Sequence, residues 1–136
     1  MSRIIRRVIK TSNAPAPVGP YSQAVQAGDT LYVSGCLGLD KTSLKLVPGG
    51  AAQEAEKALE NLEAVLSAAD TSIAHVVKTT VFLDDINDFA AVNEVYKKHF
   101  KDPFPARSCF QVGKLPLGAK VEIEVVAIVG NLVTAE

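Results

Sequence analysis

Two short stretches near the C-terminus carry charged residues at a spacing that could build a binding or catalytic site. In FPARSCFQV, Arg107 precedes Cys109 by two positions, and in VEIEVVAI, Glu122 precedes Glu124 by two positions. Side chains alternate between the two faces of a β-strand, so the members of each pair share a face. If these strands are antiparallel neighbours, a permanent cation and a carboxylate can meet across the sheet.

Arg107 admits two interpretations at this point. It forms a buried ion pair with a glutamate and fixes the register of two strands, or its planar guanidinium awaits a substrate carboxylate, which it can bind through two hydrogen bonds. Arg107 lies two residues after Pro105, where the chain enters a predicted strand. That position suits the wall of a cleft better than the centre of a core.

The two cysteines and two histidines offer weaker candidates. Cys109 could act as a nucleophile if the neighbouring cation stabilised its thiolate, but no histidine close in sequence supplies a base. An ordinary buried cysteine is the favoured interpretation, and Cys36 has still less support. Since these residues lack metal-ligand spacing, we expect no metal site, and we expect His75 and His99 to be solvated.

Hydrophobic periodicity predicts the elements that must position these residues. We expect a first strand at 3–10, a hairpin at 24–40 around the turn at Gly28 and Asp29, a helix at 51–70, a buried strand at 72–83, a second helix at 85–100 and closing strands at 106–113 and 120–130. Asp85 or Asp88 is the expected N-cap of the second helix. The prediction is one α+β domain over residues 1–136, with a mixed sheet of about six strands and two helices on one face.

The predicted sheet is apolar on both faces, although two helices can cover only one. In the last strand Val121, Ile123 and Val125 lie on one face, and the other face ends in Val126 and Ile128. A second chain is therefore expected to cover the rest, which predicts an obligate homo-oligomer.

Composition narrows the function classes. The chain has 136 residues, 48% of them hydrophobic, and 14 Lys and Arg against 15 Asp and Glu give a formal charge of −1. This balance makes nucleic acid an unlikely main partner. The basic stretch RIIRRVIK resembles a transit peptide, but a first strand with solvated arginines is favoured. Without an apolar stretch of roughly 20 residues, no membrane span is predicted, and we expect a cytoplasmic protein, with the nucleus or mitochondrion as alternatives.

Five stretches in order, VGPYSQAV, YVSGCLGLD, VVKTTVFLDDINDFAAVNEVY, FPARSCFQV and VEIEVVAI, resemble the signatures of the RidA (YjgF/YER-type) family of reactive-intermediate deaminases. The resemblance covers residues 7–128. It implies a chorismate-mutase-like fold and a homotrimeric barrel with three clefts between subunits. The implied reaction is hydrolysis of 2-imino acids, such as 2-iminopropanoate and 2-iminobutanoate, to 2-oxo acids and ammonia, without a cofactor or metal.

The resemblance also assigns residues to roles. It implies that Arg107 binds the substrate carboxylate and that Glu122 positions the attacking water. The other substrate-binding residues that it implies are Tyr21, Ser34, Gly35, Phe89, Asn93 and Cys109. Many members have Gln where this chain has Cys36, so the preferred imine stays open. A ribonuclease or translation inhibitor, supported by the basic N-terminal stretch, and a chaperone-like binding protein are the alternative functions.

Overall fold

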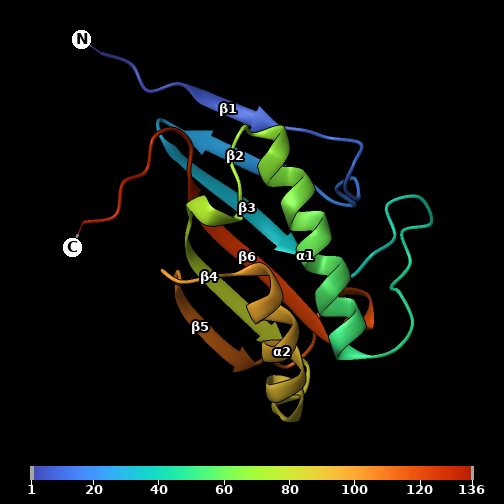
Figure 1. The fold of residues 1–136 in the computed structure, drawn as a ribbon. Helices are drawn as coiled ribbons and strands as arrows, with labels where there is room; N and C mark the ends of the chain where they lie inside the picture. The colour runs from blue at the N-terminus through green and yellow to red at the C-terminus, as the bar shows by residue number, and fades with distance from the viewer. Residues whose placement is uncertain (1, 136) are drawn as a thin grey trace.

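Six strands form one mixed sheet with both helices packed on the same face (Figure 1). The computed structural model describes residues 2–135. The elements are β1 (Arg6–Ile9), β2 (Ala24–Ala27), β3 (Thr30–Cys36), α1 (Ala51–Ala68), β4 (Val76–Leu83), α2 (Phe89–His99), β5 (Ala106–Gln111) and β6 (Val121–Ile128). The predicted α+β class, the strand count and the placement of the helices are confirmed.

The strands run in the order β1-β2-β3-β6-β4-β5, and β4 and β5 are the parallel pair. The two closing strands are therefore not neighbours, because β4 lies between them. Burial explains this order. On β6 the face of Val121, Ile123 and Val125 is at most 3% exposed, whereas β5 is largely exposed. The more apolar strand takes an interior position with two neighbours, and β5 becomes an edge.

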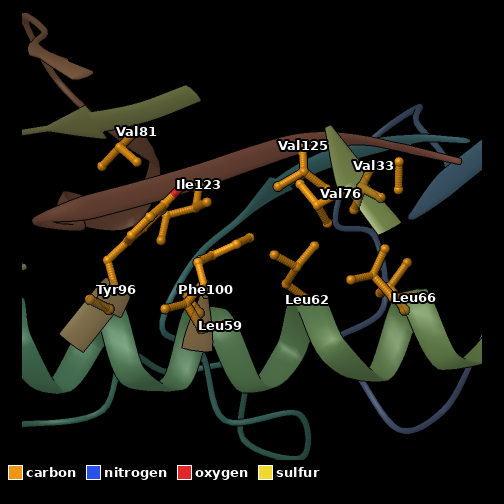
Figure 2. Packing of buried hydrophobic residues seen from close by; sticks show 14 of the residues in the cluster. Val33, Leu59, Leu62, Leu66, Val76, Val81, Tyr96, Phe100, Ile123 and Val125 are labelled. Atoms are coloured by element: carbon orange, nitrogen blue, oxygen red, sulfur yellow. The ribbon is translucent and has the colours of Figure 1, made fainter. Parts of the chain in front are cut away.

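Helix α1 supplies most of the core that holds the sheet. Leu59, Leu62 and Leu66 recur at helical spacing and are completely buried. Figure 2 shows these leucines between the helix and the sheet, with Tyr96 and Phe100 packed beside them. Replacing one of these leucines by alanine would cost about 2–5 kcal/mol of folding stability, because it removes buried methyl groups and leaves a cavity.

Several elements are shorter than the sequence predicts, and three of the differences lie around β4 and α2. The strand expected from residue 72 begins at Val76, because residues 73–75 form a 3₁₀ turn in which the N–H of His75 donates to the carbonyl of Ser72. Asp85 caps the short 3₁₀ turn at 86–88 by accepting from the N–H of Asn87, so α2 begins one turn later. Helix α2 ends at His99, and Phe100 is buried just beyond it.

The face of the sheet opposite the helices carries an apolar row across neighbouring strands. Val8, Val25, Tyr32 and Val126 are aligned in register on β1, β2, β3 and β6. Val8 is 57% exposed and Tyr32 is 54% exposed. No other part of residues 2–135 packs over this row of side chains. Separately, none of the helices described is long and apolar enough to cross a membrane.

Candidate active site

A pocket of about 420 Å³ at the end of β3 brings four of the predicted site residues together. Tyr21, Ser34, Gly35 and Glu122 all line it. They come from the loop before β2, from the C-terminal end of β3 and from β6. The strand register shifts between Val33 and Cys36, so the chain bulges at Ser34 and Gly35 and brings their backbone to the pocket.

Glu122 lies directly against Gly35. A Cβ atom placed on Gly35 would be 2.5 Å from Oε2 of Glu122, so a side chain at this position would displace the carboxylate. Burial raises the pKa of Glu122, and the neighbouring charge of Glu124 raises it further. A carboxylate with a raised pKa takes up a proton more readily, which suits it to act as a general base.

Ser34 connects the pocket to the segment that carries Tyr21. Its hydroxyl donates to the carbonyl of Ser22 at 2.6 Å, and its backbone N–H donates to the carbonyl of Gln23 at 3.0 Å. Because the hydroxyl donates its proton to the backbone, the side chain of Ser34 holds the loop before β2 in place. Tyr21 is half exposed at the pocket, with its hydroxyl 3.4 Å from the N–H of Val18.

Gln23 is a positioning residue that the sequence analysis missed. Its amide is almost completely buried, with Oε1 accepting from the N–H of Thr11 at 2.8 Å. Its Nε2 faces the carbonyls of Thr11, Ala14 and Pro15. These bonds hold the proline-rich outer wall of the pocket. The available signal was NAPAPVGP, a stretch whose prolines lack N–H groups and whose carbonyls need donors from elsewhere.

Arg107 lies outside the Glu122 pocket, in a cradle formed by side chains of α2. Its Nη1 donates to Oδ1 of Asn93 at 2.7 Å, and its Cζ lies 4.8 Å from the ring centroid of Tyr96 and 5.5 Å from that of Phe89. A shallow pocket of about 300 Å³ lies beside it. Phe89 and Asn93 were predicted with Arg107, whereas Tyr96 was not assigned a site role.

The ion pair considered between Arg107 and a glutamate on the next strand is wrong for the single chain. Arg107 is in register with Thr79, whose hydroxyl contacts Tyr96 on the helix side of the sheet. Glu122 is in register with Phe82, whose ring packs on Phe110 on the opposite side. Within residues 2–135 Arg107 makes no salt bridge, so its charge is balanced by no acidic side chain there.

Both cysteines are poor nucleophiles at neutral pH. Burial raises the pKa of Cys36 to about 12, with a further contribution from the charge of Glu122. Burial also raises the pKa of Cys109, although the charge of Arg107 opposes this shift. Neutral thiols are expected at both positions, which agrees with the favoured interpretation of each as an ordinary cysteine. Cys109 packs against the core beside the Arg107 position and lines neither pocket.

The expectation of solvated histidines is wrong for His99. Its Nδ1 is 3.0 Å from a carboxylate oxygen of Glu63, and its Nε2 bonds to Glu56. Burial alone would lower the pKa of His99, but the hydrogen bonds and charges of the two carboxylates outweigh it, and the pKa is raised. His75 approaches the carbonyl of Ile128 at 3.3 Å. In the described part of the chain, no group of three or more His, Cys, Asp or Glu side chains could hold a metal ion.

These features define a class of protein: a small α+β domain whose sheet carries a pocket with a carboxylate and, separately, an arginine held against helix α2. A model of the family described as endoribonuclease L-PSP matches residues 11–129. The chain is 63% identical over 134 residues to the RutC family protein UK114 of Drosophila melanogaster, covering 98% of this chain and 97% of that protein. This chain belongs to the family described as endoribonuclease L-PSP, which the match over residues 11–129 shows.

Three further comparisons each cover at least 90% of this chain. The 2-iminobutanoate/2-iminopropanoate deaminase of Homo sapiens is 56% identical over 135 residues, which is 99% of this chain and 98% of that protein. The crystal structure of RidA from an Antarctic Psychrobacter has a TM-score of 0.87 at 45% identity, covering 90% of this chain and 99% of that one. Escherichia coli TdcF with bound serine has a TM-score of 0.85 at 39% identity, covering 91% and 99%.

Proposed function

We propose that this protein hydrolyses 2-imino acids to 2-oxo acids and ammonia. The observation that carries the proposal is Arg107, a guanidinium oriented by neutral side chains and balanced by no acidic group in the described chain. Such a group fits a ligand carboxylate. Several relatives, including the human protein at 56% identity, are named for this activity, and the structure of TdcF holds serine, which also bears a carboxylate.

The chemistry assigns one role to each half of the site. Arg107 binds the carboxylate and holds the C=N carbon beside a water molecule on Glu122. Glu122 accepts a proton from the water molecule. At the same time the oxygen of the water bonds to the carbon of the protonated imine, which forms a carbinolamine. Proton transfer from oxygen to nitrogen then lets the C–N bond break. Ammonia leaves and takes the proton from Glu122 as ammonium, and the carbon becomes the ketone of a 2-oxo acid.

A second copy of the chain is needed to unite the two halves. Arg107 and Glu122 lie on opposite faces of the sheet with β4 between their strands. The open apolar row of Val8, Val25, Tyr32 and Val126 supports an interface on the face that also carries Glu122. We propose a homotrimer in which Arg107 of one copy reaches the Glu122 pocket of the next; the number three comes from the family resemblance.

Mixing two inactive variants tests the shared site. Arg107→Ala and Glu122→Gln should each be inactive or slow alone. After refolding an equal mixture, random assortment should produce intact sites at about one quarter of the wild-type number, because each site takes one residue from each of two copies. Ammonia release from 2-iminopropanoate measures this. A mixture as inactive as its components would exclude a shared site, and light scattering would report the oligomer independently.

RNA cleavage is the second candidate, because the matching family is described as an endoribonuclease. The charge balance of −1 gives it little support, and no Lys, Arg or His within residues 2–135 lines the Glu122 pocket. Incubation with a labelled single-stranded RNA decides the matter, since RNA cleavage that survives Glu122→Gln would point to a different site.

The cytoplasmic location stays a proposal that cell fractionation can test.

A further inference from the structure

Helix α1 buries two polar side chains, Glu54 and Asn61, among its apolar residues. Glu54 is 4% exposed and Asn61 is 5% exposed. They are seven positions apart, which is about two helical turns, so they lie on the same side of α1. Burial of a polar group is unfavourable unless the group is hydrogen-bonded, so the partners of these two side chains indicate what they do.

Asn61 fixes the segment that follows the bulge at Gly35. Its Nδ2 donates to the carbonyls of Leu37 and Leu39, at 3.0 Å each. The first of these carbonyls lies only two positions beyond Gly35. The chain is therefore bonded to α1 directly after it leaves the Glu122 pocket.

Gly38 brings the same segment against the backbone of α1. A Cβ atom placed on Gly38 would lie 2.6 Å from the Cα atom of Glu54 and 2.6 Å from its carbonyl oxygen. Backbone atoms of a helix cannot rotate away as the end of a side chain can, so only glycine fits between the segment and the helix. The chain beyond Gly35 is thus both packed on α1 and bonded to it.

The side chain of Glu54 holds the other strand of the site. Its Oε1 accepts from the backbone N–H of Lys120 at 2.9 Å, and the carbonyl of Lys120 accepts from the N–H of Asp84 at 3.0 Å. Lys120 is the last residue before β6 and lies two positions before Glu122. The entry to β6 is therefore bonded to α1 on one side and to the residue after β4 on the other.

We propose that Glu54 and Asn61 are positioning residues that set the contact between Gly35 and Glu122, and with it the direction of the Glu122 carboxylate. Gly35 and Glu122 belong to β3 and β6, and α1 crosses both strands (Figure 1). Because these strands are antiparallel, the segment after Gly35 and the entry to β6 lie at the same end of the pair. One helix therefore holds both members of the contact.

The Glu122 carboxylate depends on this support because it has little other. A Cβ atom on Gly35 would lie 2.5 Å from Oε2 and 2.9 Å from Cγ of Glu122, so the whole end of the side chain packs on the glycine backbone. Within residues 2–135 no hydrogen bond contributes to the ionisation of this carboxylate, which is governed by burial and by the charge of Glu124. Its direction is thus set by the relative position of two backbones.

The test removes the bond at each end while keeping the approximate shape of the side chain. Glu54→Met and Asn61→Leu lose their hydrogen bonds, whereas Glu54→Gln keeps an oxygen that can accept from Lys120. We expect kcat for 2-iminopropanoate to fall by at least about tenfold in the first two variants, because small misplacements of a catalytic group are costly. KM should change by less than about twofold, since the carboxylate-binding Arg107 is untouched. Glu54→Gln should restore kcat to within about threefold of the wild type.

A second readout does not depend on turnover, although the kinetic consequence rests on the proposed function. NMR of glutamate labelled at its carboxyl carbon follows the ionisation of Glu122, and its signal is assigned by its absence from Glu122→Gln. The titratable groups that face Glu122 are Glu124 on its own strand, Cys36 on β3 and Tyr21 in the pocket wall. None of them changes in the variants.

The expected shift follows from the loss of burial. Burial raises the pKa of Glu122, so a carboxylate that moves off Gly35 into solvent should have a pKa closer to 4.5. We expect this lower pKa in Glu54→Met and in Asn61→Leu. Glu54→Gln removes the same charge as Glu54→Met but keeps the bond, so its smaller shift measures the electrostatic part alone. The two disruptive variants break different bonds, so either one is sufficient for the test.

Two controls separate positioning from loss of stability. Leu66→Ala, at a completely buried position of the same helix that does not line the pocket, should lower the melting temperature without changing kcat or the pKa of Glu122. Adding Glu54→Met to Glu122→Gln should slow hydrolysis by less than about a further twofold, because a positioning residue has no effect once the group that it positions is gone.

The outcomes distinguish this inference from the proposed function. If Glu54→Met and Asn61→Leu keep the wild-type kcat and the wild-type pKa of Glu122, or if Leu66→Ala lowers both as much, the positioning role is excluded and the deaminase proposal stands. If the wild type hydrolyses 2-iminopropanoate no faster than buffer, the proposed function fails, and the pKa of Glu122 in the variants alone decides whether α1 places the carboxylate.

Discussion

The guanidinium of Arg107 lies over the ring of Tyr96, with Cζ 4.8 Å from the ring centroid. The ring is itself fixed, because its hydroxyl is 2.9 Å from that of Thr79 and its face stacks on Phe100 with centroids 4.3 Å apart. Asn93 occupies one N–H of the guanidinium. The arginine is therefore held in one direction from a rigid base while most of its donors stay free for a ligand.

Arg107→Ala should abolish measurable imine hydrolysis and 2-oxo acid binding. Each charge-assisted hydrogen bond that is lost contributes roughly 1.5–3 kcal/mol. Arg107→Lys should not restore activity, because an ammonium has no planar fork and stacks less well on Tyr96. Assays of ammonia release and calorimetry with 2-oxobutanoate measure both effects. Wild-type hydrolysis by either variant would remove Arg107 from the site.

The melting temperature of the same proteins distinguishes a binding role from a structural one. Arg107 is exposed and makes no salt bridge within residues 2–135, so its removal should cost less than about 1 kcal/mol, the scale of an exposed cation–π contact. A sharp fall in melting temperature together with loss of the oligomer would instead assign Arg107 to the interface.

Gly35→Ala should slow hydrolysis while leaving the fold intact. The new methyl group would lie 2.5 Å from Oε2 of Glu122, so the carboxylate must move away from the attacking water. We expect kcat to fall by at least about tenfold, because small misplacements of a catalytic group are costly. Gly113→Ala is the matched control, since nothing lies within 4 Å of its added carbon. Equal activities of the two variants would contradict the contact.

The pH dependence of hydrolysis should report the ionisation of Glu122. Its pKa is raised from the ordinary value of 4.5, and the base is the deprotonated form, so activity should rise with pH through a midpoint above 4.5. Glu124→Gln removes a repelling charge and should move that midpoint to lower pH. Rates are compared with the spontaneous reaction at each pH, and Glu94→Gln on α2 is the control.

Removal of the carboxylate itself completes this test. Glu122→Gln should slow hydrolysis by about 10² or less, the low end for general acid–base catalysis, and should keep 2-oxo acid binding. The rise of activity with pH should also disappear in this variant. If the rise were unchanged, a group other than Glu122 would be responsible for it. If the variant lost only its affinity for the 2-oxo acid, Glu122 would serve only to balance the charge of Arg107.

The link between His99 and helix α1 should make stability depend on pH. The folded-state pKa of His99 is raised above 6.5, so its protonated form stabilises the fold below that pH, and this contribution disappears as pH rises through the folded-state pKa. The melting temperature of the wild type should therefore fall more between pH 6 and 9 than that of His99→Gln. Glu60→Gln, on the same helix but bonded to Lys57, is the control. Parallel curves would contradict a raised pKa.

The elements with strong periodicity could be predicted from sequence, and those that depend on tertiary contacts could not. The spacing of Leu59, Leu62 and Leu66 was sufficient for α1. The 3₁₀ turn before Val76 was missed, because β-branched residues dominate that stretch and a three-residue turn has no periodicity. The condition that β5 and β6 be neighbours is not met, because β4 lies between them, and nearness in sequence does not decide which strand inserts between two others.

The site could be predicted only where a motif carried it. The resemblance selected Tyr21, Ser34 and Gly35, which do lie together with Glu122, but no residue pattern indicated that Arg107 would face away from them. Tyr96 has a pattern typical of core residues on a helix, and its second role as a platform arises from its tertiary contact with Arg107 on β5, which helical periodicity does not indicate.

The bonds made by Gln23 imply an order of events during folding. They join positions only eight to twelve residues apart, so the outer wall of the pocket closes over a short loop. Gly35 meets Glu122 across most of the chain, and that loop costs more entropy to close. We expect the outer wall of the pocket to form early during folding and Glu122 to join it last, because β6 must first insert between β3 and β4.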